Sequence, residues 1–152
     1  APKYYEGYLT NGKPITEENI KAMLAEAEKG MPDGTAWSTG EFYYYYTKCF
    51  PGYSRVGGCG SFAAGLSDYI FGKDAPVTKH QNFDSLKVGD VIWWKDSSDG
   101  YDHIVFVTGL KSDTEYICCN GNSSKSVWWN RKDNIADWSQ TQRAETYVYS
   151  RY

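Results

Sequence analysis

Histidine is scarce in this sequence, and the CxxC cysteine motif is absent. Histidine occurs at two positions only, and no two of the four cysteines are separated by two intervening residues. Zinc sites and thioredoxin-type redox sites are usually built on CxxC pairs, so the cysteine pattern argues against both. A redox function is therefore a weak interpretation of this chain.

Long apolar runs and clusters of basic residues are also missing. The apolar stretches fall far short of the roughly 20 residues that a membrane-spanning helix needs. The net charge is −3 and no Lys/Arg cluster is present, which argues against nucleic acid as the main partner. No internal repeat or low-complexity linker interrupts the chain, so we expect a single domain over residues 1–152.

Aromatic residues are abundant, at 17% of the chain with 14 Tyr and 6 Trp. Aromatics favour strands and offer surfaces on which sugars and peptides stack. The segment EFYYYYTKCF (41–50) fits either a strand or a groove wall. A stacking role for residues 42–46, 93–94 and 128–129 competes with simple packing of these side chains.

Two segments carry the apolar period of an amphipathic helix. In residues 15–30, Thr16 is placed to cap the helix, Ile15 and Ile20 occupy the positions of a hydrophobic staple, and Gly30 lies at its end. A second helix begins at Cys59 and ends at Gly72. From residue 86 onward the pattern changes to short β-rich runs separated by turn residues, namely LKVGDVIWW, HIVFVTG, EYICCNG, KSVWW and ETYVYSR. This order predicts an α+β fold, with N-terminal helices packed on a C-terminal antiparallel sheet of about five strands.

Cys59 is the candidate nucleophile. It stands among three glycines in GYSRVGGCGSFAAGLSDYIFG (52–72), and a nucleophile needs such neighbours because substrate and backbone must approach it closely. At the start of a helix, backbone N–H groups and the helix dipole favour a thiolate. Cys118 and Cys119 are adjacent, so in a strand they point to opposite faces and are poor partners for each other. A disulfide from Cys49 to either one stays open.

His103 is the candidate base. His80 lies in a polar connection and fits a solvated loop histidine, whereas His103 opens the strand HIVFVTG after a polar loop. If the hairpin centre falls between Lys111 and Ser112, His103 lies directly opposite Asn120. The Asn120 amide oxygen would then fix the imidazole tautomer, although a shift of one residue in register would remove this contact.

A Cys–His–Asn set is a known solution for acyl transfer. Cys59 would attack a carbonyl as a thiolate, His103 would take the thiol proton and return it to the leaving amine, and Asn120 would orient His103. The Cys59 backbone N–H and the Tyr53 hydroxyl are candidate donors to the oxyanion, with packing as the alternative role for Tyr53.

The order of these motifs resembles the NlpC/P60 and CHAP group of papain-like cysteine peptidases and amidases. The matching segments are GGCGSFAAGLSDYIFG, VGDVIWW, DHIVFVTG and CNGN, within roughly residues 15–130. The likeness is greatest to CHAP-like modules of secreted or surface proteins of Gram-positive bacteria, in which a motif EGN stands where this chain has Asn120 and its two successors. Asp68 lies in the LSD step of the same pattern, where a structural role is the simpler interpretation.

The resemblance implies a papain-like fold and hydrolysis of peptide or amide bonds, commonly in cell-wall peptidoglycan. It implies no metal and no organic cofactor. Together with a chain that starts at Ala1 rather than Met, it leads us to expect a secreted or cell-surface bacterial protein. Two alternatives stay open: a thiol acyltransferase that uses the same residues, and a non-catalytic module that binds a glycan or peptide on the same fold.

Overall fold

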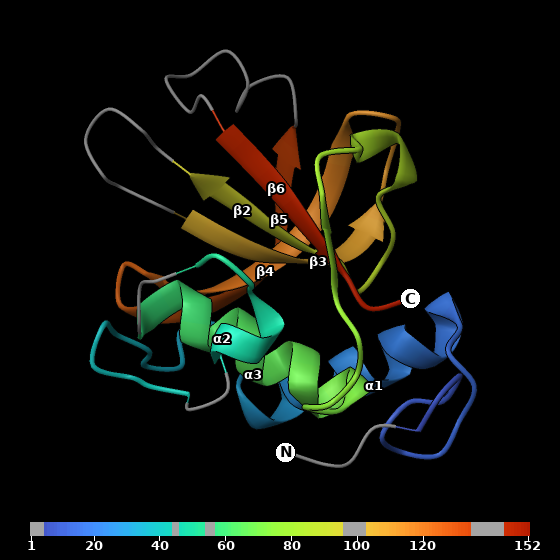
Figure 1. The fold of residues 1–152 in the computed structure, drawn as a ribbon. Coiled ribbons are helices and arrows are strands. Elements are labelled where there is room, and N and C mark those ends of the chain that lie inside the picture. The colour runs from blue at the N-terminus through green and yellow to red at the C-terminus, as the bar shows by residue number, and fades with distance from the viewer. Residues whose placement is uncertain (1–4, 44–45, 54–56, 96–102, 135–144) are drawn as a thin grey trace.

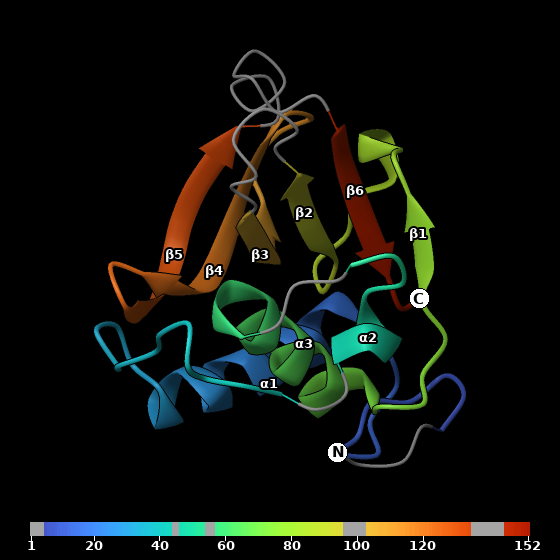
Figure 2. The same cartoon turned by 60° about the vertical axis from the view of Figure 1, so that its left-hand side comes forward.

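The computed structural model of the chain describes residues 5–43, 46–53, 57–95, 103–134 and 145–152. In these ranges the helices gather on one side of a six-stranded antiparallel sheet (Figure 1). The strand order is β1-β6-β2-β3-β4-β5, and Figure 2 shows β5 and β1 at the two edges. The strands are β1 (Thr78–His80), β2 (Val91–Lys95), β3 (His103–Leu110), β4 (Glu115–Ser123), β5 (Ser126–Asn134) and β6 (Glu145–Ser150). The predicted α+β arrangement is confirmed, with β1 as one strand more than expected.

Helix α1 (Glu17–Gly30) begins and ends where its sequence signals place it. The Thr16 hydroxyl accepts a hydrogen bond of 3.1 Å from the backbone N–H of Asn19, which satisfies one of the free N–H groups of the first turn. Ile20, Met23 and Leu24 form its buried stripe. The predicted cap and the predicted apolar face are therefore both confirmed.

Helix α3 (Gly58–Phe71) starts one residue earlier than predicted, so Cys59 is its second residue. Its N-cap is Gly57, which provides no side-chain hydrogen bond to the first turn. At the other end Gly72 adopts φ 97°, and its N–H donates to the carbonyl of Asp68 at 2.8 Å. In the described ranges no helix is both long enough and apolar enough to cross a membrane.

The described end of the tyrosine-rich segment forms a helix rather than the strand that we considered for it. A short helix, α2 (Tyr46–Cys49), follows the part of this segment that lies outside the described residues. The interpretation of residues 46–49 as a strand is therefore wrong. A single turn of helix has too few residues to show an apolar period, so the sequence pattern could not identify it.

Alternation along the strands divides the sheet into two faces. The inner face packs on α1 and α3 and carries Val91, Trp93, Ile104, Phe106, Cys119, Val127, Trp129 and Tyr149. The outer face carries Ile92, Trp94, Val105, Val107, Tyr116, Cys118 and Val148. Part of the outer face is covered by the 3-10 turn η1 (Phe83–Ser85), whose Phe83 ring stacks on Trp94 at 6.0 Å. Both faces of β2 are consequently buried.

The cysteines follow this division. Cys118 and Cys119 lie on opposite faces, as their adjacency predicted. None of Cys49, Cys59, Cys118 and Cys119 is in a disulfide. The disulfide that stayed open for Cys49 is therefore not formed.

The β3–β4 hairpin has a different register from the one that we predicted. Phe106 pairs with Cys119, and on the turn side of a bulge between Val107 and Gly109, Gly109 pairs with Ile117 rather than with Thr114. Next to the turn Leu110 pairs with Tyr116, so the turn is centred at Asp113 rather than between Lys111 and Ser112, and this displacement is the main cause of the wrong register. The bulge changes the pairing by one residue only.

Candidate active site

Cys59 is the only described cysteine that is partly exposed, whereas Cys49, Cys118 and Cys119 are buried. Burial raises the pKa of the Cys49 thiol and that of Cys119, because a thiolate is poorly solvated in the interior. Those two thiols are therefore poor nucleophiles at neutral pH. Cys59, in the uncapped first turn of a 14-residue helix, has the more favourable position for a thiolate.

The glycines around Cys59 have internal packing partners. A Cβ on Gly57 would lie 2.3 Å from the carbonyl oxygen of Thr39, and Gly57 also has φ 78°. A Cβ on Gly60 would lie 2.9 Å from the Tyr53 ring. These glycines thus let the chain approach itself, and their presence does not by itself indicate an open path for substrate.

Tyr53 lies beside the first turn of α3, which is where a hydrogen-bond donor to the oxyanion would have to lie. Its hydroxyl is 3.1 Å from the position that a Cβ on Gly60 would occupy. The ring is buried and makes edge contacts with Trp93 at 5.0 Å and with Phe50 at 5.9 Å between centroids. Packing is therefore one role of Tyr53, and its hydroxyl lies beside Gly60, the residue that follows Cys59.

His103 and Asn120 are diagonal neighbours rather than directly opposed. Continued from the Phe106–Cys119 pair without a further shift, the register places Asn120 opposite Val105 and Asn122 opposite His103. The predicted direct opposition of His103 and Asn120 is therefore wrong. Diagonal positions are about 7–8 Å apart, which long side chains can still span.

Both residues belong to the outer face. His103 pairs with Trp94 of β2, and directly paired residues of an antiparallel sheet share a face. Asn120 pairs with Trp128, whose neighbours on both sides belong to the inner face. Cys59, in contrast, packs against the inner cluster. The backbone register thus assigns the candidate base and the candidate nucleophile to opposite faces of the sheet.

The start of β3 is nevertheless close to the first turn of α3. In both views this end of the strand lies above that turn (Figures 1 and 2), and α3 contacts β3. His103 is the first residue of β3 and therefore lies at this end of the strand. To contact Cys59, its side chain would have to pass around the end of the strand to the inner face.

Asn122 of β4 lies against Gly58, the first residue of α3. The sequence analysis did not identify this residue. Its φ is 61°, and its side-chain amide nitrogen is 3.0 Å from the position of a Cβ on Gly58. On the other side of Gly58, the Trp37 indole N–H donates to the Gly58 carbonyl at 2.8 Å. The one available signal was the motif CNGN, in which Asn122 is the last residue.

The side-chain oxygen of Asn120 is a buried acceptor without a donor. Asn120 is 7% exposed, and no described residue donates a hydrogen bond to this oxygen. Leaving a buried polar group unpaired costs about 1–3 kcal/mol, so such a group calls for an explanation. An imidazole N–H on the same face of the sheet is the kind of donor that this oxygen lacks.

His80 has a structural environment. Its Nε2 lies 2.9 Å from the Ser150 hydroxyl, and its Nδ1 accepts from the backbone N–H of Asn82 at 3.1 Å. Burial lowers the pKa of His80, and the nearby charge of Lys87 lowers it further. It stands on β1, at the edge of the sheet with β6 and β2 between it and β3.

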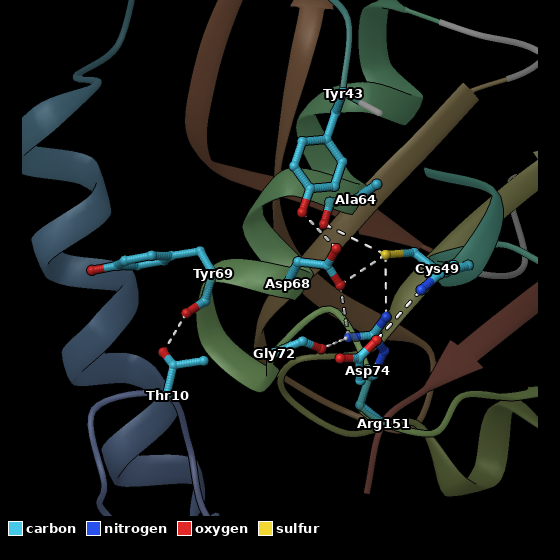
Figure 3. A network of polar contacts seen from close by, with 10 residues as sticks. Thr10, Tyr43, Cys49, Ala64, Asp68, Tyr69, Gly72, Asp74 and Arg151 are labelled. Carbon is cyan, nitrogen blue, oxygen red and sulfur yellow. Dashed lines mark hydrogen bonds and ion pairs between the residues drawn. The ribbon is translucent and has the colours of Figure 1, made fainter. Parts of the chain in front are cut away.

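Asp68 belongs to a buried network that joins α3 to the end of the chain (Figure 3). Its carboxylate accepts hydrogen bonds from Arg151 at 3.0 Å, from the Cys49 thiol at 3.0 Å and from the Tyr43 hydroxyl at 2.6 Å. Arg151 also donates to the Gly72 carbonyl at 2.8 Å. Asp68 is thus structural, through side-chain partners rather than through the backbone contacts that its helix position suggested.

The aromatic residues proposed for stacking are mostly interior. Trp93, Trp94 and Trp129 are at most 5% exposed, so packing is their main role. Trp128 is partly buried, and its ring lies 4.7 Å from the Arg131 guanidinium. Phe42 is 48% exposed, while residues 44–45 lie outside the described ranges.

Within the described ranges, no group of three His, Cys, Asp or Glu side chains is arranged to hold a metal ion.

Comparison with known proteins gives only distant likenesses. No family model and no curated protein matches the chain. It resembles the crystal structure of Ly7917 with the hydrolyzing product of MDP, at 13% identity and a TM-score of 0.48 over 90% of this chain and 63% of that one. It also resembles the crystal structure of Ly7917, at 13% identity and a TM-score of 0.46 over 88% and 62%. The chain thus spans less than two thirds of the length of Ly7917, and so distant a likeness assigns no residue a role.

Proposed function

We propose that this chain is a cysteine-dependent hydrolase of peptide or amide bonds, with Cys59 as its nucleophile. The observation that carries the proposal is the contrast between Cys59 and the other thiols. Cys59 is partly exposed in the uncapped first turn of α3, and the other three cysteines are buried. A cysteine in that position is the one most readily converted to a thiolate.

His103 takes the thiol proton in this mechanism and returns it to the leaving amine, and Asn120 orients the imidazole. The buried, unpaired oxygen of Asn120 supports its part, since it needs a donor on the face that His103 shares. The mechanism requires the His103 ring to reach around the first residue of β3 to the thiol.

The chemistry proceeds in two balanced steps. The Cys59 sulfur bonds to the carbonyl carbon, the C–N bond breaks, and the amine leaves with the proton that His103 carried. Water then attacks the thioester, His103 takes its proton, and the acid and the thiol are released. The Tyr53 hydroxyl and the Cys59 backbone N–H stabilise the oxyanion in both steps.

The substrate that we propose is a peptide of cell-wall peptidoglycan, and the location is secreted or at the cell surface. Support for both comes from the motif resemblance, in which the cysteine segment, the GD step and the CNGN segment follow in the same order. The same residues would serve a thiol acyltransferase, in which an acceptor other than water attacks the thioester.

One observation favours a second candidate function. The register assigns His103 and Cys59 to opposite faces of the sheet. A module that binds peptidoglycan without cleaving it would retain the fold and need no such pair. The two functions differ in one product: a hydrolase releases new amino groups from peptidoglycan, and a binding module releases none.

An assay on purified peptidoglycan separates them. The release of new amino groups and the sedimentation of the protein with the polymer would be measured together, for the native chain, Cys59→Ala and the thiol control Cys118→Ala, with folding checked by circular dichroism. A hydrolase releases amines and loses the release only in Cys59→Ala. Sedimentation without release supports the binding module, and release that survives in Cys59→Ala overturns the role of Cys59.

A further inference from the structure

Trp93 lies in a cluster of lysine and aromatic side chains on the inner face of the sheet. The ammonium groups of Lys79 and Lys95 are each 5.4 Å from the centre of its ring, and the Tyr147 ring is 5.5 Å away. Lys79 also lies 4.1 Å from the centre of the Tyr147 ring. Two positive charges thus stand over one tryptophan that is 4% exposed.

The sheet register brings these side chains to one face. Trp93 pairs with Tyr147, and Lys95 pairs with Glu145, across β2 and β6. Lys79 pairs with the inner-face residue Tyr149 across β1 and β6. Because paired residues share a face, the register places all of these side chains on the inner face of the sheet.

Trp93 supplies a donor that has no acceptor. Its indole N–H is buried, and no described residue accepts a hydrogen bond from it. Buried N–H groups without a partner are uncommon in native structures, so this one calls for an acceptor. Beside two ammonium groups, the acceptor that fits best carries a negative charge.

The cluster already stabilises one carboxylate of its own. Glu145 accepts a hydrogen bond of 2.7 Å from the Tyr147 hydroxyl and lies 3.6 Å from the Lys95 ammonium. These contacts, with a smaller effect from Lys79, lower the pKa of Glu145. Lys79 forms no ion pair with any described residue, so one positive charge of the cluster is still available.

A single aromatic ring separates this cluster from the candidate nucleophile. Tyr53 contacts Trp93 with its ring at 5.0 Å and lies against Gly60, the residue after Cys59. Tyr53 thus contacts both Trp93 and the residue next to Cys59, so the cluster borders the candidate site.

We propose that Lys79, Lys95 and Trp93 form a subsite that binds a carboxylate of the substrate. This inference rests on the proposed function, because it supposes that Cys59 attacks the same molecule. It narrows the substrate class to amides that carry a free carboxylate on the side of the scissile bond that faces Trp93. Neutral amides of the same shape would be poorer substrates.

Alkylation of Cys59 by matched probes tests the subsite without a known substrate. The probes are bromoacetyl conjugates of glycine, β-alanine and ε-aminocaproate, each as the free acid and as its carboxamide. Rates at Cys59 are read by peptide mass spectrometry, and each acid/amide ratio is divided by the ratio for N-acetylcysteine. We expect at least one spacer to give a ratio of about three to ten, as an exposed ion pair with added hydrogen bonds provides, and the ratio should fall with salt.

Variants assign this preference to the cluster. Lys79→Gln, Lys95→Gln and Trp93→Phe should each lower the ratio, and Glu145→Gln should raise it by releasing Lys95 and Tyr147. Lys29→Gln, an exposed lysine on α1, is the matched control and should leave it unchanged. A ratio near one for every spacer in the native chain would overturn the subsite. Because both probes attack the same thiol, the ratio does not depend on thiol activation, so failure of the proposed function would show instead in the labelling of Cys59 against pH.

Discussion

Arg151 donates a hydrogen bond of 3.0 Å to the carboxylate of Asp68, with the two side chains 2% and 0% exposed. The pair connects the residue after β6 to the last turns of α3. It thereby holds the helix that carries Cys59 against the strand that pairs with β2. The stability of the site's framework depends on two charges that are buried together.

Removing one partner of this pair should destabilise the protein strongly. Arg151→Met leaves the Asp68 carboxylate buried without its cation, which typically costs 3–5 kcal/mol, or about 4 kcal/mol here. The double variant Asp68→Asn with Arg151→Met should recover part of that loss. Urea unfolding measures both, with Lys48→Ala in the exposed Lys48–Asp74 pair as a control expected to change stability by less than about 1 kcal/mol. Equal losses in the Arg151 and Lys48 variants would contradict the structural role of the buried pair.

Asp90 should make stability fall as the pH rises through 6. Burial raises its pKa from an ordinary 3.8 to about 6, although the backbone N–H of Lys87 donates to it at 2.9 Å. The folded state therefore holds this proton more tightly than the unfolded state. Its contribution to stability is fully present below about pH 4 and is lost as the pH rises through 6.

Asp90→Asn removes this titration. The free energy of unfolding of Asp90→Asn minus that of the native chain should be about 1–3 kcal/mol larger at pH 8 than at pH 4, because only the native chain loses stability over this range. Urea unfolding at several pH values measures it. A difference between the two proteins that is constant with pH would show that Asp90 titrates normally.

Two glycines of α3 should respond oppositely to alanine. In Gly60→Ala the new methyl group would lie 2.9 Å from the buried Tyr53 ring, so we expect a loss of about 1–3 kcal/mol and a displaced Tyr53. At Gly65 the nearest atom, in Tyr43, is 3.7 Å away. Gly65→Ala should therefore stabilise the helix by up to about 1 kcal/mol. Thermal unfolding separates them, and a stabilised Gly60→Ala would contradict the contact with Tyr53.

Asn120 should be more important for reactivity than for stability. Because no described residue pairs with its buried side-chain oxygen, Asn120→Val should change the free energy of unfolding by less than about 1 kcal/mol or should stabilise the fold. If Asn120 positions His103, the same variant should slow Cys59 alkylation at mildly acidic pH by about 10-fold or more. Unchanged alkylation together with a large loss of stability would identify Asn120 as a purely structural residue.

Local signals in the sequence predicted more of the fold than of the site. The Thr16 cap, the Gly72 cap and the alternation in β3 and β4 depend on neighbouring residues, and the structure confirms them. Strand β1 was missed because its three polar residues have no apolar alternation. The partners of Asp68 and of Gly58 were also missed, since Arg151 and Asn122 meet them through contacts across the fold that no local pattern encodes.

The strand register around His103 and Asn120 could not be predicted from local patterns either. The residue types of a thiol mechanism and their order along the chain are visible in the sequence. The centre of the β3–β4 turn and the bulge between Val107 and Gly109 are not, because a turn centred one or two residues away changes every pairing along the hairpin.

The pairing of Cys59 with His103 is the central claim, and labelling of Cys59 by iodoacetamide against pH tests it most directly. The native chain, His103→Ala and the control His80→Ala would be compared by peptide mass spectrometry. We predict a labelling midpoint well below the ordinary thiol value of about 8.5 in the native chain and in His80→Ala, and a return to that value in His103→Ala. An ordinary midpoint in all three proteins would contradict the pairing and would favour the module that binds without cleaving.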